Sequence, residues 1–177
     1  MLLLRDELTS DFDATAEIVR AAFGSESVPG LVRAMRTSSA WRGLSFLAAC
    51  DDQAIGHLAF TRGWLDAPSK LIEVLILSPL SVLPEWQGKG VGRFLVEESL
   101  KRLGSRDEPL VFLEGNPAFY SRLGFLKGTD HGFTSPSSRI PDAAFQFRKL
   151  PPYDPSMTGR LVYPDVFWEM DSVGLRP

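Results

Sequence analysis

A glycine-rich segment in the middle of the chain has residue types and spacing suited to phosphate binding. Residues Val82 to Gly92 read Val-Leu-Pro-Glu-Trp-Gln-Gly-Lys-Gly-Val-Gly and lead from an apolar run into an amphipathic helix expected over Gly90 to Leu103. Its glycines allow sharp turns and a close approach of the backbone to a ligand. The unpaired N–H groups and the positive dipole end of the helix would face the same space. The segment therefore predicts a site for an anionic cofactor.

Two other glycine motifs that bind phosphate do not fit this segment. A P-loop places Ser or Thr directly after its lysine, whereas Gly90 directly follows Lys89 here. A dinucleotide-binding fingerprint reads Gly-x-Gly-x-x-Gly near a first strand, whereas residues 88–92 read Gly-x-Gly-x-Gly in mid-chain. Hydrolysis of nucleoside triphosphates and a Rossmann domain are both disfavoured.

The residues Gln87-Gly88-Lys89-Gly90-Val91-Gly92 resemble the Gln/Arg-x-x-Gly-x-Gly/Ala signature for acetyl-CoA in the GNAT superfamily of N-acetyltransferases. The preceding Leu-Ser-Val-Leu-Pro-Glu-Trp is typical of the family's fourth strand. Leu110 to Phe125 resembles the fifth strand and fourth helix, especially of the bacterial YhbS-like branch, and the tail from Gly159 resembles that branch's ending. The resemblance is sharp over residues 71–126 and weaker, but consistent in order, at both ends.

The order of expected elements predicts a mixed sheet with helices on both faces. The expected elements are helices over Asp11–Phe23, Leu31–Met35, Gly90–Leu103 and Ala118–Leu123, and strands over Leu44–Cys50, Ala54–Leu65, Leu71–Leu83, Pro109–Leu113, Ala144–Leu150 and Arg160–Phe167. The resemblance implies an α/β (α+β) GNAT fold with about six to seven mostly antiparallel strands and a splayed fourth/fifth pair. Pro79 independently suggests lost pairing in the fourth strand. Residues 1–177 are expected to form one domain.

The resemblance also implies that acetyl-CoA lies between the fourth and fifth strands. Its pantetheine arm would pair with the backbone of Ser81, Val82 and Leu83. Its pyrophosphate would lie on N–H groups of the loop, with Lys89 at most a peripheral contact. The loop residues expected to bind it are Gln87, Gly88, Lys89, Gly90, Val91 and Gly92. Asn116 is expected to cap the helix after the fifth strand, and it is also a candidate pantetheine ligand.

Acetyl transfer to an amine needs a neutral amine, because a lysine-like amine with a pKa near 10.4 is neutral in only roughly one molecule in two thousand at pH 7. Glu73 on the fourth strand is the first candidate base, although an outward-facing strand carboxylate explains it equally well. Glu114, at the end of the fifth strand, is the second. The resemblance implies that Tyr120, expected to turn aside from the core face of its short helix, is the acid for the CoA thiolate, with simple packing as the alternative. The backbone N–H of Val82 or Leu83 would stabilise the oxyanion.

Composition narrows the remaining classes of function. The formal net charge of -3, without a long run of one sign, gives no footprint for nucleic acid. No apolar stretch is long enough to cross a membrane, no signal peptide is apparent, and the single cysteine, Cys50, fits a reducing cytoplasm. His57 and His131 with Cys50 do not make a zinc set, so no metal is expected. His57 is expected to be a buried structural histidine rather than a catalytic one.

The sequence therefore predicts an acetyl-CoA-dependent N-acetyltransferase that works through a ternary complex. The alternative is a non-catalytic acyl-CoA-binding sensor or scaffold with the same fold. A nucleotide-binding protein of another class is a more remote alternative. The acceptor, a small molecule or a peptide amine, is left open, and so is the general base. A homodimer through an aromatic strand near Phe167 and Trp168 is a further possibility.

Overall fold

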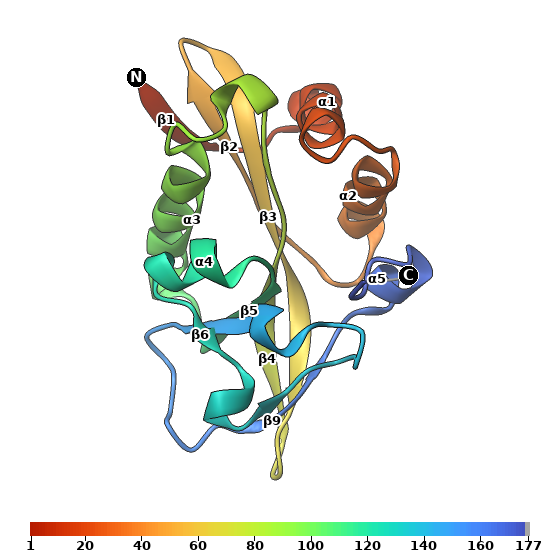
Figure 1. The fold of residues 1–177 in the computed structure, drawn as a ribbon, viewed down its shortest axis with the longest axis vertical. Helices are drawn as coiled ribbons and strands as arrows, with labels where there is room; N and C mark the ends of the chain where they lie inside the picture. The colour runs from red at the N-terminus through yellow and green to blue at the C-terminus, as the bar shows by residue number, and fades with distance from the viewer. Residues whose placement is uncertain (176–177) are drawn as a thin grey trace. The chain divides into compact units, whose positions relative to one another are not determined.

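Residues 1–175 are described in a computed structural model (Figure 1). The strands are β1 (Leu2–Asp6), β2 (Trp41–Cys50), β3 (Gln53–Asp66), β4 (Leu71–Val82), β5 (Leu110–Glu114), β6 (Leu126–Lys127), β7 (Phe133–Thr134), β8 (Phe145–Lys149) and β9 (Gly159–Val162). The helices are α1 (Phe12–Phe23), α2 (Ser27–Thr37), α3 (Val91–Arg102), α4 (Pro117–Tyr120) and α5 (Asp165–Glu169). Short 3-10 turns connect several of them, including η2 (Pro84–Trp86) before α3.

The described chain divides into two compact units. The first comprises Met1–Thr61 and Leu77–Leu103, and the second comprises Arg62–Ile76 and the chain from Gly104 onward. Since β3 and β4 contribute to both units, the hydrogen-bonded order β1-β2-β3-β4-β5-β8-β6 is continuous, with β7 and β9 off this path. The fold is the expected mixed α/β type with a mostly antiparallel sheet. That residues 1–177 behave as one domain stays a prediction.

In the first unit, β1, β2 and β3 are antiparallel neighbours with helices on both sides (Figure 1). A two-residue turn at Asp51 and Asp52, both left-handed, joins β2 to β3 and confirms the expected hairpin. A Cβ built on Gly56 of β3 would lie 2.9 Å from Leu95 of α3, so this face of the sheet packs closely on α3. The α1–α2 pair covers the other face.

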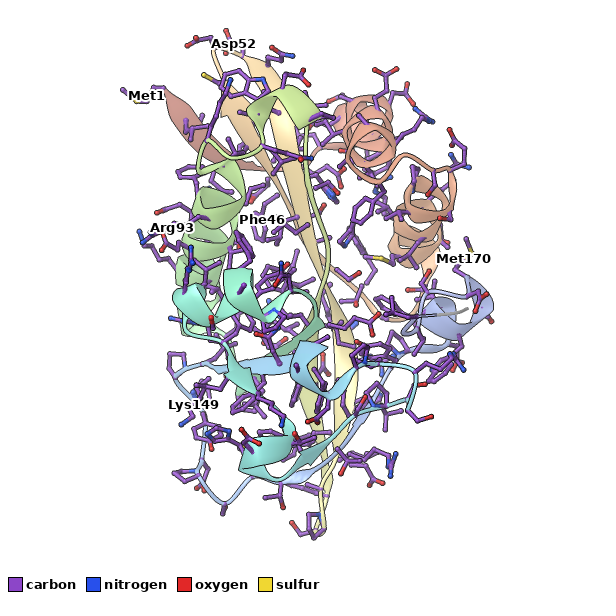
Figure 2. All side chains as sticks on the ribbon, viewed as in Figure 1. Met1, Phe46, Asp52, Arg93, Lys149 and Met170 are labelled. Carbon is purple, nitrogen blue, oxygen red and sulfur yellow. The ribbon has the colours of Figure 1, made fainter. Side chains whose placement is uncertain are left out.

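Alternation along β2 distributes side chains between these two faces. Phe46 points toward α3, where the Arg102 guanidinium lies 5.5 Å from its ring (Figure 2). The neighbouring Ser45 points the opposite way and reaches the carboxylate of Glu7 at 2.8 Å. The first unit therefore has an apolar layer under α3 and a polar cluster under α1 and α2.

In the second unit, β4 runs parallel to β5 over the pairs Leu75↔Val111 and Ile76↔Phe112. β8 pairs antiparallel with β5 and β6, while β9 pairs antiparallel with β3 and parallel with β7. The core is aromatic, with Phe112 stacked on Phe145 at 5.7 Å and edge-on to Phe133 at 5.2 Å. The β4–β5 ladder ends at Ile76, whereas β4 itself runs on past Pro79 to Val82. This loss of pairing is expected for a splayed pair.

Most expected elements are confirmed, but the strand predicted over Arg160–Phe167 is wrong in its second half. β9 ends at Val162, and Asp165–Glu169 form α5. Pro164 lacks an N–H for the ladder and lies at the N-cap position of α5, with Asp165 in the first turn. Phe167 is buried within the unit, which leaves Trp168 as the partly exposed ring of the pair proposed for dimerisation. The edge strand β1 was not expected from the sequence.

Candidate active site

The loop between β4 and α3 presents an uncapped helix N-terminus to solvent. Gly90 is the N-cap of α3 in a left-handed conformation with φ of +87°, and no side chain caps the helix. Gly88 is also left-handed, with φ of +72°. A Cβ at either glycine would meet nothing within 4 Å, so the space on the side-chain side of both glycines is open. Such a turn directs free N–H groups toward an anion.

The Gln87 side chain holds this loop against the strand before it. Its Nε2 donates a 3.0 Å hydrogen bond to the carbonyl oxygen of Val82, the last residue of β4. The turn η2 is closed by N–H donation from Trp86 to Leu83 and from Gln87 to Pro84. The Lys89 ammonium lies 5.3 Å from the Trp86 ring, a cation–π contact within the loop. Gln87 thus fixes the loop to the end of β4, a contact that the sequence motif did not predict.

The end of β4 offers backbone groups to a ligand, but the two candidate oxyanion donors are not equivalent. The Leu83 N–H donates to Ile55 O at 3.0 Å and is engaged with β3, so of the two alternatives Val82 stays the candidate. Successive N–H groups of a strand point to opposite edges, so the Val82 N–H points away from β3. The buried Ser81 Oγ has no hydrogen-bond partner among residues 1–175. A buried hydroxyl without a partner near the end of β4 fits a polar ligand at that position.

In the second unit, α4 carries Asn116 and Tyr120. The Asn116 side chain accepts a 2.9 Å hydrogen bond from Ala118 N, which confirms the helix cap. The Tyr120 ring packs edge-on against Phe119 at 4.8 Å and Phe125 at 5.4 Å. The expectation that Tyr120 turns aside from the packed face is therefore wrong for its ring. Burial raises the pKa of the Tyr120 phenol above its usual value of 10.0, so Tyr120 holds its proton at neutral pH.

Glu114 lies at the end of β5 beside a pocket of about 370 Å³ that also includes Asn116 and Ala144. Its carboxylate accepts hydrogen bonds from Gly174 N at 3.1 and 3.4 Å and from the Tyr163 hydroxyl at 3.4 Å. Desolvation raises the pKa of Glu114, and these two donors and the charge of Arg139 oppose that rise. Glu114 is thus a carboxylate with an increased affinity for protons, as a general base near neutral pH requires.

Glu73, the other candidate base, lies beside a different pocket of the second unit. This pocket of about 700 Å³ also includes Arg106 and Glu108. Arg106 is paired with Glu108 at 2.5 and 2.9 Å, and Glu73 is among the carboxylates whose charge raises the pKa of Arg106. The structure therefore separates the two carboxylates that the sequence offered as bases.

The polar cluster of the first unit centres on Glu7. The Glu7 carboxylate accepts hydrogen bonds from Thr15 Oγ1 and Arg36 at 2.5 Å and from Ser45 Oγ at 2.8 Å. Ser45 Oγ also lies 2.8 Å from Nε2 of the fully buried His57. Since the single Ser45 proton goes to Glu7, His57 Nε2 carries a proton and donates to Ser45. Desolvation lowers the pKa of His57 to about 4, which fits a neutral structural histidine.

The hydrogen-bond partners of Glu7 and Glu114 could not be found from the sequence. Tyr163 and Gly174 lie 49 and 60 positions after Glu114, and Arg36 lies 29 positions after Glu7. No local pattern marks such pairs. Among residues 1–175, no three or more His, Cys, Asp or Glu side chains are grouped so as to hold a metal ion. Within the same range, no helix has the length and apolar character needed to cross a membrane.

The known proteins that this chain resembles are acetyltransferases. The family described as "Acetyltransferase (GNAT) domain" matches residues 41–127. The chain is 33% identical over 161 residues to the "Uncharacterized N-acetyltransferase YjhQ" of Escherichia coli K12, covering 86% of each chain. It is 30% identical over 152 residues to the "Uncharacterized N-acetyltransferase YhbS" of the same strain, covering 84% of this chain and 87% of that protein.

Solved structures show the same similarity. The crystal structure of Escherichia coli YhbS in complex with CoA superposes with a TM-score of 0.84 at 29% identity, covering 94% of this chain and 91% of that chain. A GNAT family acetyltransferase from Brucella melitensis in complex with acetyl-CoA superposes with a TM-score of 0.74 at 26% identity, covering 94% and 98%.

Proposed function

The chain belongs to the GNAT family of acetyltransferases, and on that premise we propose that it transfers the acetyl group of acetyl-CoA directly to an amine within a ternary complex. The observation that carries this proposal is the uncapped, left-handed glycine turn at the start of α3, with open space in front of Gly88 and Gly90. The CoA and acetyl-CoA complexes of two similar structures support the choice of donor.

On this proposal, the N–H groups of residues 88–92 bind the pyrophosphate, and the backbone at the end of β4 around Val82 pairs with the pantetheine amides. The Ser81 hydroxyl gains the hydrogen-bond partner that it lacks among the described residues. The Val82 N–H donates to the acetyl oxygen as negative charge develops there. Acetyl-CoA supplies the activated acetyl group, and the chain's own residues bind, orient and move protons.

Tyr120 is proposed as the group that gives a proton to the departing CoA sulfur. Its raised pKa keeps the phenol protonated. The same shift makes full transfer to a thiolate, whose conjugate acid has a pKa near 8.5, unfavourable, so solvent must replace the proton as it leaves. We expect Tyr120→Phe to lower turnover with little change in acetyl-CoA affinity. The cytoplasmic location, the homodimer and the contact between Asn116 and pantetheine stay predictions.

The donor site is tested by Gly90→Val. A β-branched residue is strained at a φ of +87° and would fill the open space in front of the loop. We expect the Kd for CoA to rise at least about 100-fold, equivalent to about 2.7 kcal/mol, in isothermal titration. Gly104→Val is the matched control, because a Cβ there also meets nothing within 4 Å and its φ is not in the left-handed region.

Thiol release from acetyl-CoA with a panel of amines separates an enzyme from a non-catalytic CoA-binding protein. Binding of CoA without thiol release would leave the sensor or scaffold alternative standing. Equal CoA affinity of the wild type and Gly90→Val would show that the glycine turn does not bind CoA. Binding of ATP or NAD in preference to CoA would place the chain's ligand in another class.

A further inference from the structure

The pocket beside Glu114 combines one carboxylate with apolar walls. It lies within the second unit and has a volume of about 370 Å³, near the lower limit for sites that bind small molecules. Its apolar wall residues include Pro117, Pro141, Ala144 and Leu175. Glu114 is the carboxylate in its lining, and Asn116 contributes a side-chain amide whose oxygen already caps α4. One charged group in a small apolar pocket selects a ligand with one complementary charge.

The Glu114 carboxylate retains capacity for such a ligand. Its two oxygens provide about four acceptor sites. The contacts within the unit are one backbone N–H and one hydroxyl, at 3.1 to 3.4 Å, which is long for donors to a carboxylate. The nearby Arg139 guanidinium donates to the carbonyl of Val173 at 3.3 Å instead. Glu114 therefore lacks a short charged donor, and an ammonium group would supply one.

We propose that this pocket is the acceptor site, that it takes a primary amine carried on a compact apolar group, and that Glu114 receives the ammonium and removes its proton. This inference rests on the proposed function and names its substrate class. A polyamine is disfavoured because its second and third ammonium groups would meet proline, alanine and leucine side chains, where an unpaired charge is costly. The favoured acceptors are arylalkyl and short alkyl amines.

The proton balance of the reaction is complete with these groups. Glu114 takes one proton from R–NH₃⁺ and gives it to solvent. The neutral nitrogen then forms a bond to the acetyl carbon, and the carbon–sulfur bond breaks with its electron pair on sulfur. The nitrogen releases its second proton to solvent, the sulfur receives one from Tyr120 on the proposed mechanism, and solvent returns a proton to the Tyr120 oxygen. The net products are the amide R–NH–COCH₃, CoA thiol and one proton.

The structure also indicates what holds Glu114 in place. The Gly174 N–H donates to its carboxylate, and Leu175 N donates to Arg139 O at 3.1 Å, so the segment after α5 is fastened on both sides of this contact. Gly174 is left-handed with φ of +66°, and a Cβ there would lie 2.6 Å from the Arg139 carbonyl carbon. Gly174 and Tyr163 are thus positioning residues for Glu114.

The test measures kcat/KM for 2-phenylethylamine, spermidine and the peptide Ala-Ala-Ala by thiol release from acetyl-CoA. We expect 2-phenylethylamine to be preferred. We expect Glu114→Gln, which keeps the shape and an acceptor oxygen, to lower its kcat/KM at least about 100-fold while the KM for acetyl-CoA is unchanged. Glu169→Gln, an exposed carboxylate of α5, is the matched control and should leave both constants unchanged.

A second variant tests the pocket independently of the carboxylate. Ala144→Leu adds volume in the lining while the backbone bonds of Ala144 to Gly115 and Pro141 are retained. We expect it to raise the KM for 2-phenylethylamine at least about tenfold with a smaller change in kcat, because a larger side chain reduces the room for the amine. This result remains informative even if Glu114→Gln folds poorly.

The failures are distinguishable. Thiol release that prefers spermidine or the peptide, or that is unaffected by both Glu114→Gln and Ala144→Leu, overturns the acceptor pocket while the proposed function stands. CoA binding without thiol release for any of the three amines contradicts the proposed function and, with it, the assignment of Glu114 as a base. A drop caused equally by Glu169→Gln would show a general effect of charge and overturn the role of Glu114.

Discussion

Glu7 in the first unit and Glu114 in the second are both shielded from water, but their surroundings differ. Glu7 accepts hydrogen bonds of 2.5 to 2.8 Å from a guanidinium and two hydroxyl groups. Glu114 accepts bonds of 3.1 to 3.4 Å from a backbone N–H and a phenol. Glu7 is surrounded by its donors, whereas Glu114 lies beside a pocket. Full satisfaction of a buried charge stabilises structure, and partial satisfaction leaves the group available to a substrate.

The difference explains which carboxylate is suited to chemistry. A base must accept and release protons, so tight donors that fix its charge oppose its function. Desolvation without strong donors gives Glu114 a raised pKa and unused acceptor capacity. Glu7 instead joins the segment after β1 to α1, α2 and β2 through Thr15, Arg36 and Ser45. The comparison therefore predicts effects on stability for the first carboxylate and effects on activity for the second.

The largest expected effect on stability comes from Glu7→Gln. The Glu7 side chain is 1% exposed and its partner Arg36 is 12% exposed, so the substitution leaves a buried guanidinium without its charge partner. Breaking such a buried pair typically costs about 3–5 kcal/mol. We expect a loss of this size in the free energy of unfolding, measured by urea denaturation. Glu17→Gln, an exposed carboxylate of α1, should change it by less than about 0.5 kcal/mol.

Glu114→Gln in the same denaturation experiment separates the two sites. The glutamine retains an acceptor for Gly174 and Tyr163 and removes the desolvation cost of the charge, so stability at pH 7 should change far less than for Glu7→Gln. Equal losses for the two variants would contradict the division into a structural and a chemical carboxylate.

The next effect is a dependence of stability on pH that arises from His57. Its folded pKa of about 4 lies below the ordinary value of 6.5, because burial disfavours the charged ring. The charge of Glu7 raises this pKa and the charge of Arg36 lowers it. The unfolded chain therefore binds a proton that the folded protein rejects. The resulting stability is complete above pH 6.5 and is lost as the pH falls toward 4. The full loss is about 3 kcal/mol.

Denaturation of the wild type and His57→Gln between pH 7 and pH 4 measures this contribution. The glutamine variant should lose less stability than the wild type over the same interval, whatever its stability at pH 7. His131→Gln is the matched control, because His131 is exposed. Parallel pH profiles for the wild type and His57→Gln would show that the buried ring is not the source of the acid sensitivity.

Features that depend on a few adjacent residues are predictable from the sequence. The glycine turn between β4 and α3 was predicted because its signals are local: glycines at fixed spacing, a strand before them and a helical pattern after them. The cap at Asn116 and the hairpin at Asp51 and Asp52 were predicted on similar grounds, since their backbone conformations depend on a few adjacent residues. The location of each candidate base could not be predicted in the same way.

Long-range packing decides what the local pattern leaves undetermined. Glu73 and Glu114 both lie on strands, but only their distant neighbours distinguish a carboxylate beside an arginine-containing pocket from one beside an apolar pocket. The Tyr120 ring was expected to avoid the packed face, and its contact with Phe125 across Gly124 overrides helical spacing. The Arg160–Phe167 segment has strand-forming residues, but Pro164 ends the pairing and Asp165 begins a helix.

The smallest effect is predicted for Tyr163→Phe, which alters the proton affinity of Glu114 without removing its carboxylate. The Tyr163 hydroxyl donates to Glu114 at 3.4 Å and lowers the pKa of that carboxyl, so its loss should raise the pKa further above the ordinary value of 4.5. A base must be ionised, so the acid limb of the kcat/KM profile should move to higher pH while the plateau is retained. Stability should fall by about 1 kcal/mol or less, because the bond is long.

Using one amine for all variants keeps the amine's own ionisation common to every profile. Tyr153→Phe, whose ring instead lies near Lys149, is the matched control and should leave the acid limb in place. An acid limb that stays fixed in Tyr163→Phe, or that moves to lower pH, would mean that Glu114 is not the group whose ionisation limits the reaction, and the contrast with Glu7 would then rest on stability alone.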